Sequence, residues 1–262
     1  MNRTLSSLSL SALAIGVALV SSVAAINPAE AFTISLDPSQ GSTENTGSTA
    51  LLDFNFVQDG SNVKLNLGFQ NTTNGSTGLG ATASTLVGVG FDLPALIKGF
   101  SYNASGSAFT KLYGDSSLNQ SVVGEAALNP FGTFDVGIRS AGPGTFAGGN
   151  PQTGLTAGNS TLVSFIFSGT GLTASLVENS FLSGIKNNSL NIVGRFQQVN
   201  AGGGSDKVLG GLVSGISSAP EITPISVGEN SAAAPEPMTI LGAIAAGSAI
   251  LGRKKLQRKA NA

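Results

Sequence analysis

Alternation between apolar and polar residues is the feature that most limits how this chain can fold. Residues 52–56 and 63–69 alternate strictly, with Asp53 and Lys64 among the polar members. A period of two places the apolar side chains on one face of a β-strand and the polar ones on the other. The loop between the runs, 58–62, contains a Gly and has the length of a hairpin connection. The sequence therefore predicts a β-hairpin with one buried face.

Similar short runs recur through the central part of the chain. All fourteen Phe and both Tyr residues lie between Phe32 and Phe196, and aromatic side chains supply much of the buried area of a core. The one modest helical candidate is 178–183. We therefore expect an all-β fold, a single antiparallel β-sandwich of jelly-roll or immunoglobulin-like type over residues 32–201. Its further strands are predicted at 85–92, 98–103, 109–113, 133–139, 161–168, 172–177 and 190–198.

Composition narrows the chemistry that the chain can perform. The 262 residues include no Cys, His or Trp. The usual ligands of transition metals are therefore missing, as are a Ser-His-Asp triad and a Cys nucleophile. Between Phe32 and Ala234 the chain has seven basic and twelve acidic residues, a balance that disfavours nucleic acid as a partner. We predict no metal, no cofactor and no enzymatic activity.

Three weaker signals point to other functions. Asp53, Asp92 and Asp135 lie on predicted strands, and a glycosidase needs two carboxyl groups about 5 to 10 Å apart. Residues 183–186 match the S-x-x-K pattern of serine β-lactamases, but the S-D-N and K-T-G partners are missing. The loop 59–62 offers oxygen ligands for calcium without a D-x-D-x-D-G run. Solvated strand faces and chance matches explain these signals more simply.

The first 31 residues predict a secretory signal peptide. Arg3 precedes a run, 8–25, that contains no charged residue. Ala29-Glu30-Ala31 then fits the small-x-small rule of a signal peptidase site. We expect signal peptidase to cleave after Ala31, so that the mature protein begins at Phe32. The competing cleavage region is 24–25.

The end of the chain carries three features in a fixed order. Pro235-Glu236-Pro237 comes first, an uncharged apolar stretch at 238–252 follows, and Arg253-Lys254-Lys255 opens a basic tail that runs to 262. Fifteen residues of helix measure about 22 Å, which is short of a bilayer core of about 30 Å. Basic residues behind such a span remain in the cytoplasm. These features predict a transient transmembrane helix, which a Gly-, Ser- and Pro-rich linker at 202–234 would join to the folded domain.

This order resembles the PEP-CTERM sorting signal of Gram-negative bacteria that make exopolysaccharide. The resemblance implies that exosortase, a membrane protease-transpeptidase, recognises Pro235, Glu236 and Pro237 and removes the helix. Arg253, Lys254 and Lys255 would then halt translocation. The protein would pass through the inner membrane as an intermediate and reach the outer envelope, the cell surface or the extracellular matrix.

Segments of the body carry a second, less specific resemblance. They are Val89-Gly90-Phe91-Asp92, Phe134-Asp135-Val136-Gly137, Gly148-Gly149-Asn150-Pro151 and parts of 195–207. They are similar to segments of cyanobacterial PEP-CTERM proteins, including the cistern type, a resemblance that implies no biochemical activity. We expect an exported structural or adhesion protein associated with exopolysaccharide. A carbohydrate-binding module is the alternative, and it would need exposed aromatic and amide side chains on one sheet; a carbohydrate-active enzyme is the third hypothesis.

Overall fold

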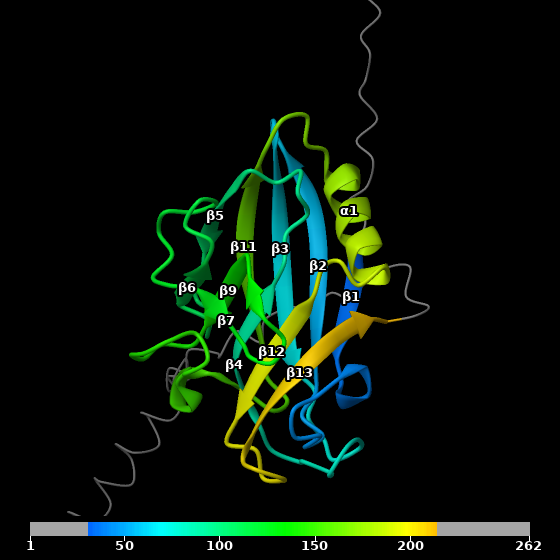
Figure 1. Cartoon of the computed structure of the whole chain (residues 1–262), viewed down its shortest axis with the longest axis vertical. Coiled ribbons are helices and arrows are strands. Elements are labelled where there is room, and N and C mark those ends of the chain that lie inside the picture. Colours follow the sequence, from blue (N-terminus) through cyan, green and yellow to red (C-terminus); the bar gives the residue numbers. More distant parts are fainter. Residues whose placement is uncertain (1–30, 214–262) are drawn as a thin grey trace, which may run out of the picture.

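The computed structural model describes residues 31–213, which form a mostly β domain (Figure 1). Its helices are α1 (Ala174–Lys186) and two short 3-10 turns, η1 (Pro38–Gln40) and η2 (Pro151–Thr153). Its strands are β1 (Ala31–Leu36), β2 (Ala50–Asp59), β3 (Asn62–Asn71), β4 (Thr85–Phe91), β5 (Gly99–Asn103), β6 (Lys111–Gly114), β7 (Ala126–Ala127), β8 (Thr133–Phe134), β9 (Val136–Arg139), β10 (Leu155–Thr156), β11 (Ser160–Ser168), β12 (Ile192–Gln197) and β13 (Ser205–Leu212).

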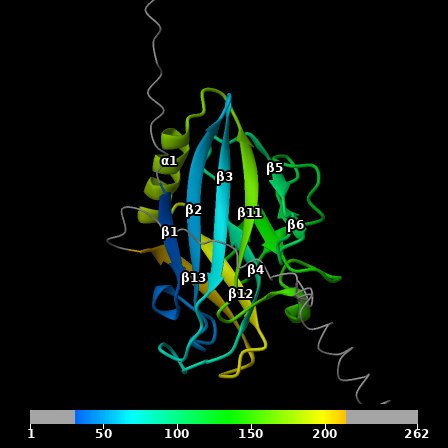
Figure 2. The ribbon, with the colours of Figure 1, turned by 180° about the vertical axis from the view of Figure 1, so that it is seen from behind.

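Eleven of these strands form one antiparallel sheet that curls until it is nearly closed into a barrel (Figures 1 and 2). Their order is β5-β11-β3-β2-β1-β13-β12-β4-β9-β6, with β10 beside β4, while β7 and β8 pair separately. The predicted mostly-β, antiparallel class is confirmed. Two halves of the sheet face each other as the layers of a sandwich do, but β1 pairs with β13, Ile34 opposite Leu212, and joins them into one sheet.

The joining strand β13 corrects the predicted start of the linker. The frequent glycines at 202–234 predict a tether, yet Ser205–Leu212 pairs with β1 on one side and with β12 on the other. Asp206 and Val208 alternate inward within this strand, and both are fully buried. The folded domain therefore extends at least to Leu212.

The gap between the two outer strands, β5 and β6, is bridged by the segment 115–124. Phe100 N of β5 donates to Leu118 O at 3.2 Å. Gly114 N of β6 donates to Gly124 O at 2.8 Å, and Val123 N donates to Leu112 O at 3.0 Å. The same loop thus satisfies backbone groups of both edge strands.

The hairpin of β2 and β3 is confirmed, with the predicted face buried. Leu52 lies opposite Phe69 and Phe54 lies opposite Leu67. The turn between the strands closes at Asp59 opposite Asn62. Gly60 in this turn has a φ of +59°, a conformation that glycine adopts without the steric cost of a side chain.

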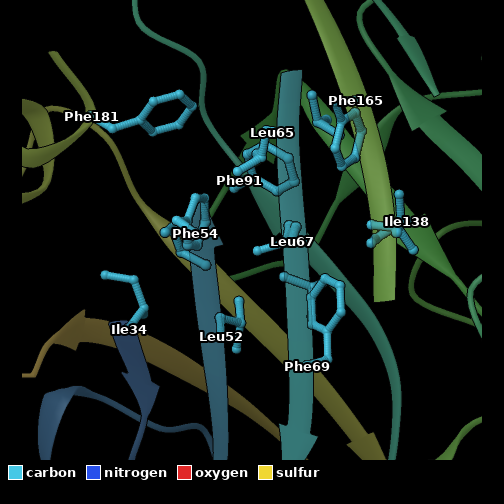
Figure 3. Packing of buried hydrophobic residues seen from close by; sticks show 14 of the residues in the cluster. Ile34, Leu52, Phe54, Leu65, Leu67, Phe69, Phe91, Ile138, Phe165 and Phe181 are labelled. Atoms are coloured by element: carbon cyan, nitrogen blue, oxygen red, sulfur yellow. The ribbon is translucent and has the colours of Figure 1, made fainter. Parts of the chain in front are cut away.

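The core between the two halves is rich in Phe (Figure 3). The Phe91 ring of β4 makes edge-on contacts with Phe54 of β2, centroids 6.2 Å apart, and with Phe165 of β11 at 5.6 Å. Aromatic pairs of this geometry contribute about 0.5–1.5 kcal/mol beyond their buried area. They therefore hold together halves that are far apart in sheet order.

Helix α1 starts earlier and ends later than the predicted helical segment. The apolar pattern predicts a strand at 172–177, but Thr173 Oγ1 accepts a hydrogen bond from Leu176 N and starts a helix there. Phe181 of α1 is fully buried, and its ring lies 5.4 Å from that of Phe56. This tertiary contact favours the helix over the strand that the local apolar pattern predicts.

A second, smaller core covers the outer side of the other half of the sheet. Phe134 and Phe146 pack there with Tyr113 and Val193. Gly90 and Gly137 make room for them, because a Cβ would lie 2.7 Å from the Phe134 ring at Gly90 and 2.9 Å from the Phe146 ring at Gly137. At Gly90 and Gly137 the missing side chain therefore leaves the space that the covering aromatic rings occupy.

Candidate functional site

The outward side chains of β1, β2, β3, β11 and β5 form what we call the outer polar face. Figure 2 shows the ribbon of these neighbouring strands. The strand register sets amide and hydroxyl groups side by side across it. Asn55 of β2 lies opposite Asn66 of β3, Asn66 lies opposite Ser164 of β11, and Ser164 lies opposite Asn103 of β5. This row of polar groups is a direct consequence of the period-two pattern, since its members alternate with the Phe and Leu residues of the core.

A hollow of about 340 Å³ lies on this face beside the β2–β3 turn. Exposed aliphatic side chains flank its polar groups: Val57 is 40% exposed and Ile166 is 36% exposed. Asn103 Oδ1 already accepts from Ser105 N at 2.9 Å. Its amide nitrogen therefore remains to donate to a ligand. The residues that line the hollow are Val57, Gln58, Asp59, Lys64, Ser101, Asn103, Ser164 and Ile166.

Next to the hollow lies a set of outward residues that we call the buried row: Thr33, Asp53, Asn55 and Gly68. Thr33 Oγ1, Asp53 Oδ1 and Asn55 Oδ1 are buried oxygens without a hydrogen-bond partner among the residues that the structure describes. Asp53 is only 9% exposed, and desolvation by this burial raises its pKa from 3.8 to about 6. Buried polar atoms in proteins are normally paired, so this row is the least satisfied polar part of the described domain.

Asp206, at the start of β13, is also a buried carboxylate, but unlike Asp53 it is surrounded by hydrogen-bond donors. Its oxygens accept hydrogen bonds from Ser42 Oγ at 2.7 Å, Thr46 N at 2.9 Å and Glu44 N at 3.0 Å, among others. Burial alone would raise the pKa of Asp206, but bonds from Thr46, Ser42 and Glu44 hold it below its ordinary value. The carboxylate orders the loop 42–46 and offers no free oxygen for chemistry.

The three carboxylates considered for a glycosidase do not form an acid–base pair across a cleft. Asp92 and Asp135 lie close enough that the charge of Asp135 contributes to a raised Asp92 pKa, after the larger effect of burial. Each binds backbone: Asp92 Oδ2 accepts from Asn191 N at 2.9 Å, and Asp135 Oδ2 accepts from Leu93 N at 2.8 Å. Asp53 lies in the other half of the sheet, on its outer face.

The remaining sequence signals do not form enclosed sites either. Ser183 and Lys186 are both exposed near the end of α1. The loop Asp59–Asn62 is the β2–β3 turn. Within the described range, no group of three or more acidic, His or Cys residues is placed to hold a metal ion.

One buried group was missed by the sequence reasoning. Arg139 of β9 is 1% exposed, and its Nε and Nη2 donate to the Tyr113 hydroxyl at 3.0 and 2.7 Å. Nη2 also donates to the carbonyls of Gly142, Pro143 and Gly144. The guanidinium thereby pins a Gly- and Pro-rich loop to the sheet. An alternating strand pattern predicts Arg139 to be solvated, and only its long-range partners reveal its role.

Part of the predicted site lies outside the described residues. Ala29 and the sorting motif, Pro235-Glu236-Pro237 with Arg253-Lys254-Lys255, are there, whereas Ala31 is the first residue of β1. In residues 31–213 no helix has the length and apolar character to cross a membrane. Comparison with protein-family models, with curated proteins and with solved structures finds no match to this chain.

Proposed function

We propose that this protein is an exported, non-enzymatic component of the cell envelope or extracellular matrix that adheres to exopolysaccharide through the hollow of the outer polar face. The observation that supports this function is the hollow itself, in which hydroxyl, amide and amine groups stand beside exposed aliphatic side chains. Sugars present hydroxyl groups together with C–H faces, so both parts of such a surface can contact them.

The hollow is shallow and lacks the aromatic rings that a high-affinity sugar site would offer. The rings of Phe165 and Phe167 in β11 point inward, and both residues are fully buried. Even a hydrogen bond within a folded protein contributes only about 0.5–1.5 kcal/mol net, because it replaces hydrogen bonds to water. Adhesion at this face therefore suits a repetitive polymer on which many weak contacts add, and many copies on a surface would strengthen it further.

Delivery to that location is the second part of the proposal. The signal peptide that ends at Ala31 directs the chain out of the cytoplasm. Pro235-Glu236-Pro237 and the basic cluster from Arg253 to Lys255 present it to an exosortase-type protease. After removal of the helix, the domain reaches the surface on its linker.

Adhesion can be tested with the chain from Phe32 to Ala234. Binding to immobilised dextran, xyloglucan and alginate is measured for the wild type and for Ser101→Val/Ser164→Val, which keeps strand-compatible residues but removes two hydroxyls from the hollow. We expect at least tenfold weaker retention of the double variant on whichever polymer binds. Gln152→Leu, an exposed change outside the hollow, is the matched control. Equal retention of all three proteins contradicts this role of the hollow.

Sorting is tested separately in cells. Replacing Pro235-Glu236-Pro237 by Ala-Ala-Ala should leave full-length precursor in the inner membrane, while deletion from Met238 onward should release soluble protein to the periplasm. N-terminal sequencing of surface material should begin at Phe32. Recovery of tail peptides 256–262 from wild-type surface material contradicts the sorting proposal and leaves the adhesion proposal intact.

A further inference from the structure

Four of the seven basic residues in the acidic body of the chain, 32–234, lie in one row across the sheet. In register order the row is Lys207 (β13), Arg195 (β12), Gly88 (β4), Arg139 (β9) and Lys111 (β6). The row points outward, because Phe196 and Val208, the next residues of β12 and β13, belong to the Phe-rich core. It lies on the side of the domain opposite the outer polar face (Figures 1 and 2). We call its four cationic members the basic row.

Arg195 and Lys207 are like charges directly opposite each other, a placement that destabilises a sheet. Both are partly buried, and Arg195 Nε is a buried donor without a hydrogen-bond partner among the described residues. Burial and the positive charge of Arg195 lower the pKa of Lys207, while Asp206 and Glu44 raise it. The carboxylate of Asp206 is already bonded to the loop 42–46. Buried donors in proteins normally have an acceptor, so this pair lacks an anion on its outer side.

A pocket of about 570 Å³, which we call the basic pocket, opens at Lys207. Pockets of about 300–1,000 Å³ are the size that small ligands occupy. Thr145 and Asn129 bring polar groups to its lining, Phe146 brings a ring, and Glu125 is its exposed acidic member. Lys207 Nζ donates to Asn129 O. An ammonium group has three N–H donors, so the nitrogen is held at the wall of the pocket with further donors for a ligand.

The loop 145–148 places the basic pocket next to Arg195. Gln197, the next outward residue of β12, donates through Nε2 to the carbonyl at position 148 of this loop. Across the sheet, a Cβ at Gly88 would lie 3.5 Å from the Phe146 ring of the same loop. The loop therefore reaches the neighbours of Arg195 both along β12 and toward β4, and its residues 145–147 line the pocket. Arg195 thus lies between this loop and the lysine opposite it, at the edge of the basic pocket.

Arg139, the next cation of the basic row, adds charge to this region without being accessible. It is 1% exposed, and its Nη1 is a buried donor with no partner among the described residues. Its described hydrogen-bond partners are a hydroxyl and backbone carbonyls, none of them a carboxylate. Charges of one sign that gather along a low-dielectric wall raise the potential there and attract counter-ions.

We propose that Arg195 and Lys207 bind an oxyanion carried on a sugar, the carboxylate of a uronic acid unit, and that the basic pocket is a site for acidic polysaccharide. Arginine matches the two oxygens of a carboxylate with its fork of N–H groups, and lysine adds a point charge. The polar groups of Asn129 and Thr145 would contact the hydroxyls of the same sugar. The site does not depend on the hollow, which lies on the opposite side of the domain. A chain that carries both sites would join two polymer strands.

Calorimetric titration of the full chain with alginate oligomers, and separately with dextran oligomers of equal length, tests this site. Alginate carries a carboxylate on each sugar and dextran carries none. We expect the wild type to bind alginate oligomers and Arg195→Gln to bind them at least tenfold more weakly, because the change removes the charge and the fork of donors. The matched control is Lys111→Gln, the same charge change at the exposed far end of the basic row and outside the pocket. Equal weakening by both variants would be a response to net charge alone and overturns the proposal.

Two further titrations identify the ligand and separate this site from the hollow. Inorganic sulfate should compete with alginate oligomers for the wild type, and binding of sulfate without binding of alginate overturns the assignment to polysaccharide. Ser101→Val/Ser164→Val should retain the binding that Arg195→Gln loses. The reverse result, in which the double variant loses alginate and Arg195→Gln keeps it, overturns the basic pocket and leaves adhesion at the hollow intact.

Thermal melts separate binding from folding. Because Arg195 Nε has no described hydrogen bond to lose, Arg195→Gln should not melt below the wild type in the absence of ligand. Saturating alginate oligomers should raise the Tm of the wild type and of Lys111→Gln but not that of Arg195→Gln. Lys207→Gln, a change at a partly exposed side chain, should behave as Arg195→Gln does and takes its place if that variant does not fold. An equal rise in Tm for all the proteins overturns the proposal.

Discussion

Asp53 and Asp206 are buried carboxylates of the same sheet, and their surroundings are opposite. Asp206 is 0% exposed and accepts hydrogen bonds from Ser42, Thr43, Glu44 and Thr46. Asp53 is 9% exposed, and its Oδ1 has no partner in the described part of the chain. Burial raises the pKa of both groups, but only at Asp206 do donors reverse the effect. The donors around Asp206 therefore order the 42–46 loop, whereas Asp53 Oδ1 has no such donors among the described residues.

The largest effect should follow from Asp206→Ala. The change removes the acceptor of Thr46 N, one of the two acceptors of Thr43 N and of Glu44 N, and the acceptor of the Ser42 hydroxyl, and a buried donor left without an acceptor costs about 1–3 kcal/mol. We expect the free energy of unfolding to fall by at least about 3 kcal/mol. Urea denaturation of the chain from Phe32 to Ala234, followed by circular dichroism, measures it. A loss below about 1 kcal/mol would show that the loop holds without this carboxylate.

Replacing each carboxylate by its amide should change the free energy of unfolding in opposite directions at the two sites. Asp206→Asn exchanges an acceptor oxygen for a donor that faces donors, so we expect a loss of about 2 kcal/mol. Asp53→Asn removes a buried charge that burial disfavours, so we expect a gain of about 1 kcal/mol at pH 7, well within the roughly 3 kcal/mol that a shift of this size allows. The same urea titration compares them. Equal losses in the free energy of unfolding for the two variants would contradict the difference between the two sites.

The pH dependence of the wild-type protein's stability should show the separate contributions of Asp53 and Asp206. Because the folded pKa of Asp53 is raised to about 6, its contribution to stability is complete below pH 3.8 and is lost as the pH rises through 6. The pKa of Asp206 is lowered, so its contribution is present above 3.8 and is lost as the pH falls below that value. Wild-type stability should therefore peak near pH 4–5. In Asp53→Asn the decline between about pH 4 and 6 should be shallower, and an unchanged slope would contradict the raised pKa.

The smallest effects should come from the hydroxyl neighbours of the two carboxylates. Ser42→Ala removes a donor to Asp206 together with the acceptor of Asn45 N, and we expect a loss of about 1–2 kcal/mol. Thr33→Val keeps the shape of a side chain whose hydroxyl has no described partner. We expect a change within about 0.5 kcal/mol. Thermal melts of both variants make the comparison, and a loss at Thr33 as large as that at Ser42 would contradict the difference between the two surroundings.

The sequence predicted the parts of the fold that depend on local pattern. The β2–β3 hairpin follows from period-two alternation at 52–69, and the core follows from the concentration of Phe. Two features depend on distant partners and escaped prediction. Ser205–Leu212 reads as a Gly-rich tether until β1 and β12 are seen on either side of it, and the strand pattern before Glu178 becomes helical because Phe181 packs on Phe56.

In the candidate site, too, the features set by local sequence pattern were predicted and those set by distant partners were not. The polar outward positions of β2 and β3 were visible in the sequence, including Asp53 as a strand carboxylate. Their placement beside Ser164 and Asn103 was not visible, because it requires β11 to insert between β3 and β5. Sequence reasoning also could not separate Asp53 from Asp206, since the difference lies in donors more than 150 residues away in the chain.

The bridging of β5 and β6 by the segment 115–124 bears on how copies of this domain behave when crowded on a surface. Unpaired strand edges invite neighbouring molecules to add strands, which leads to aggregation. Here the loop already occupies backbone groups of Phe100, Leu112 and Gly114 at both edges. Domains packed densely at an envelope would therefore remain separate folding units, and any cohesion between them would run through side chains and shared polymer.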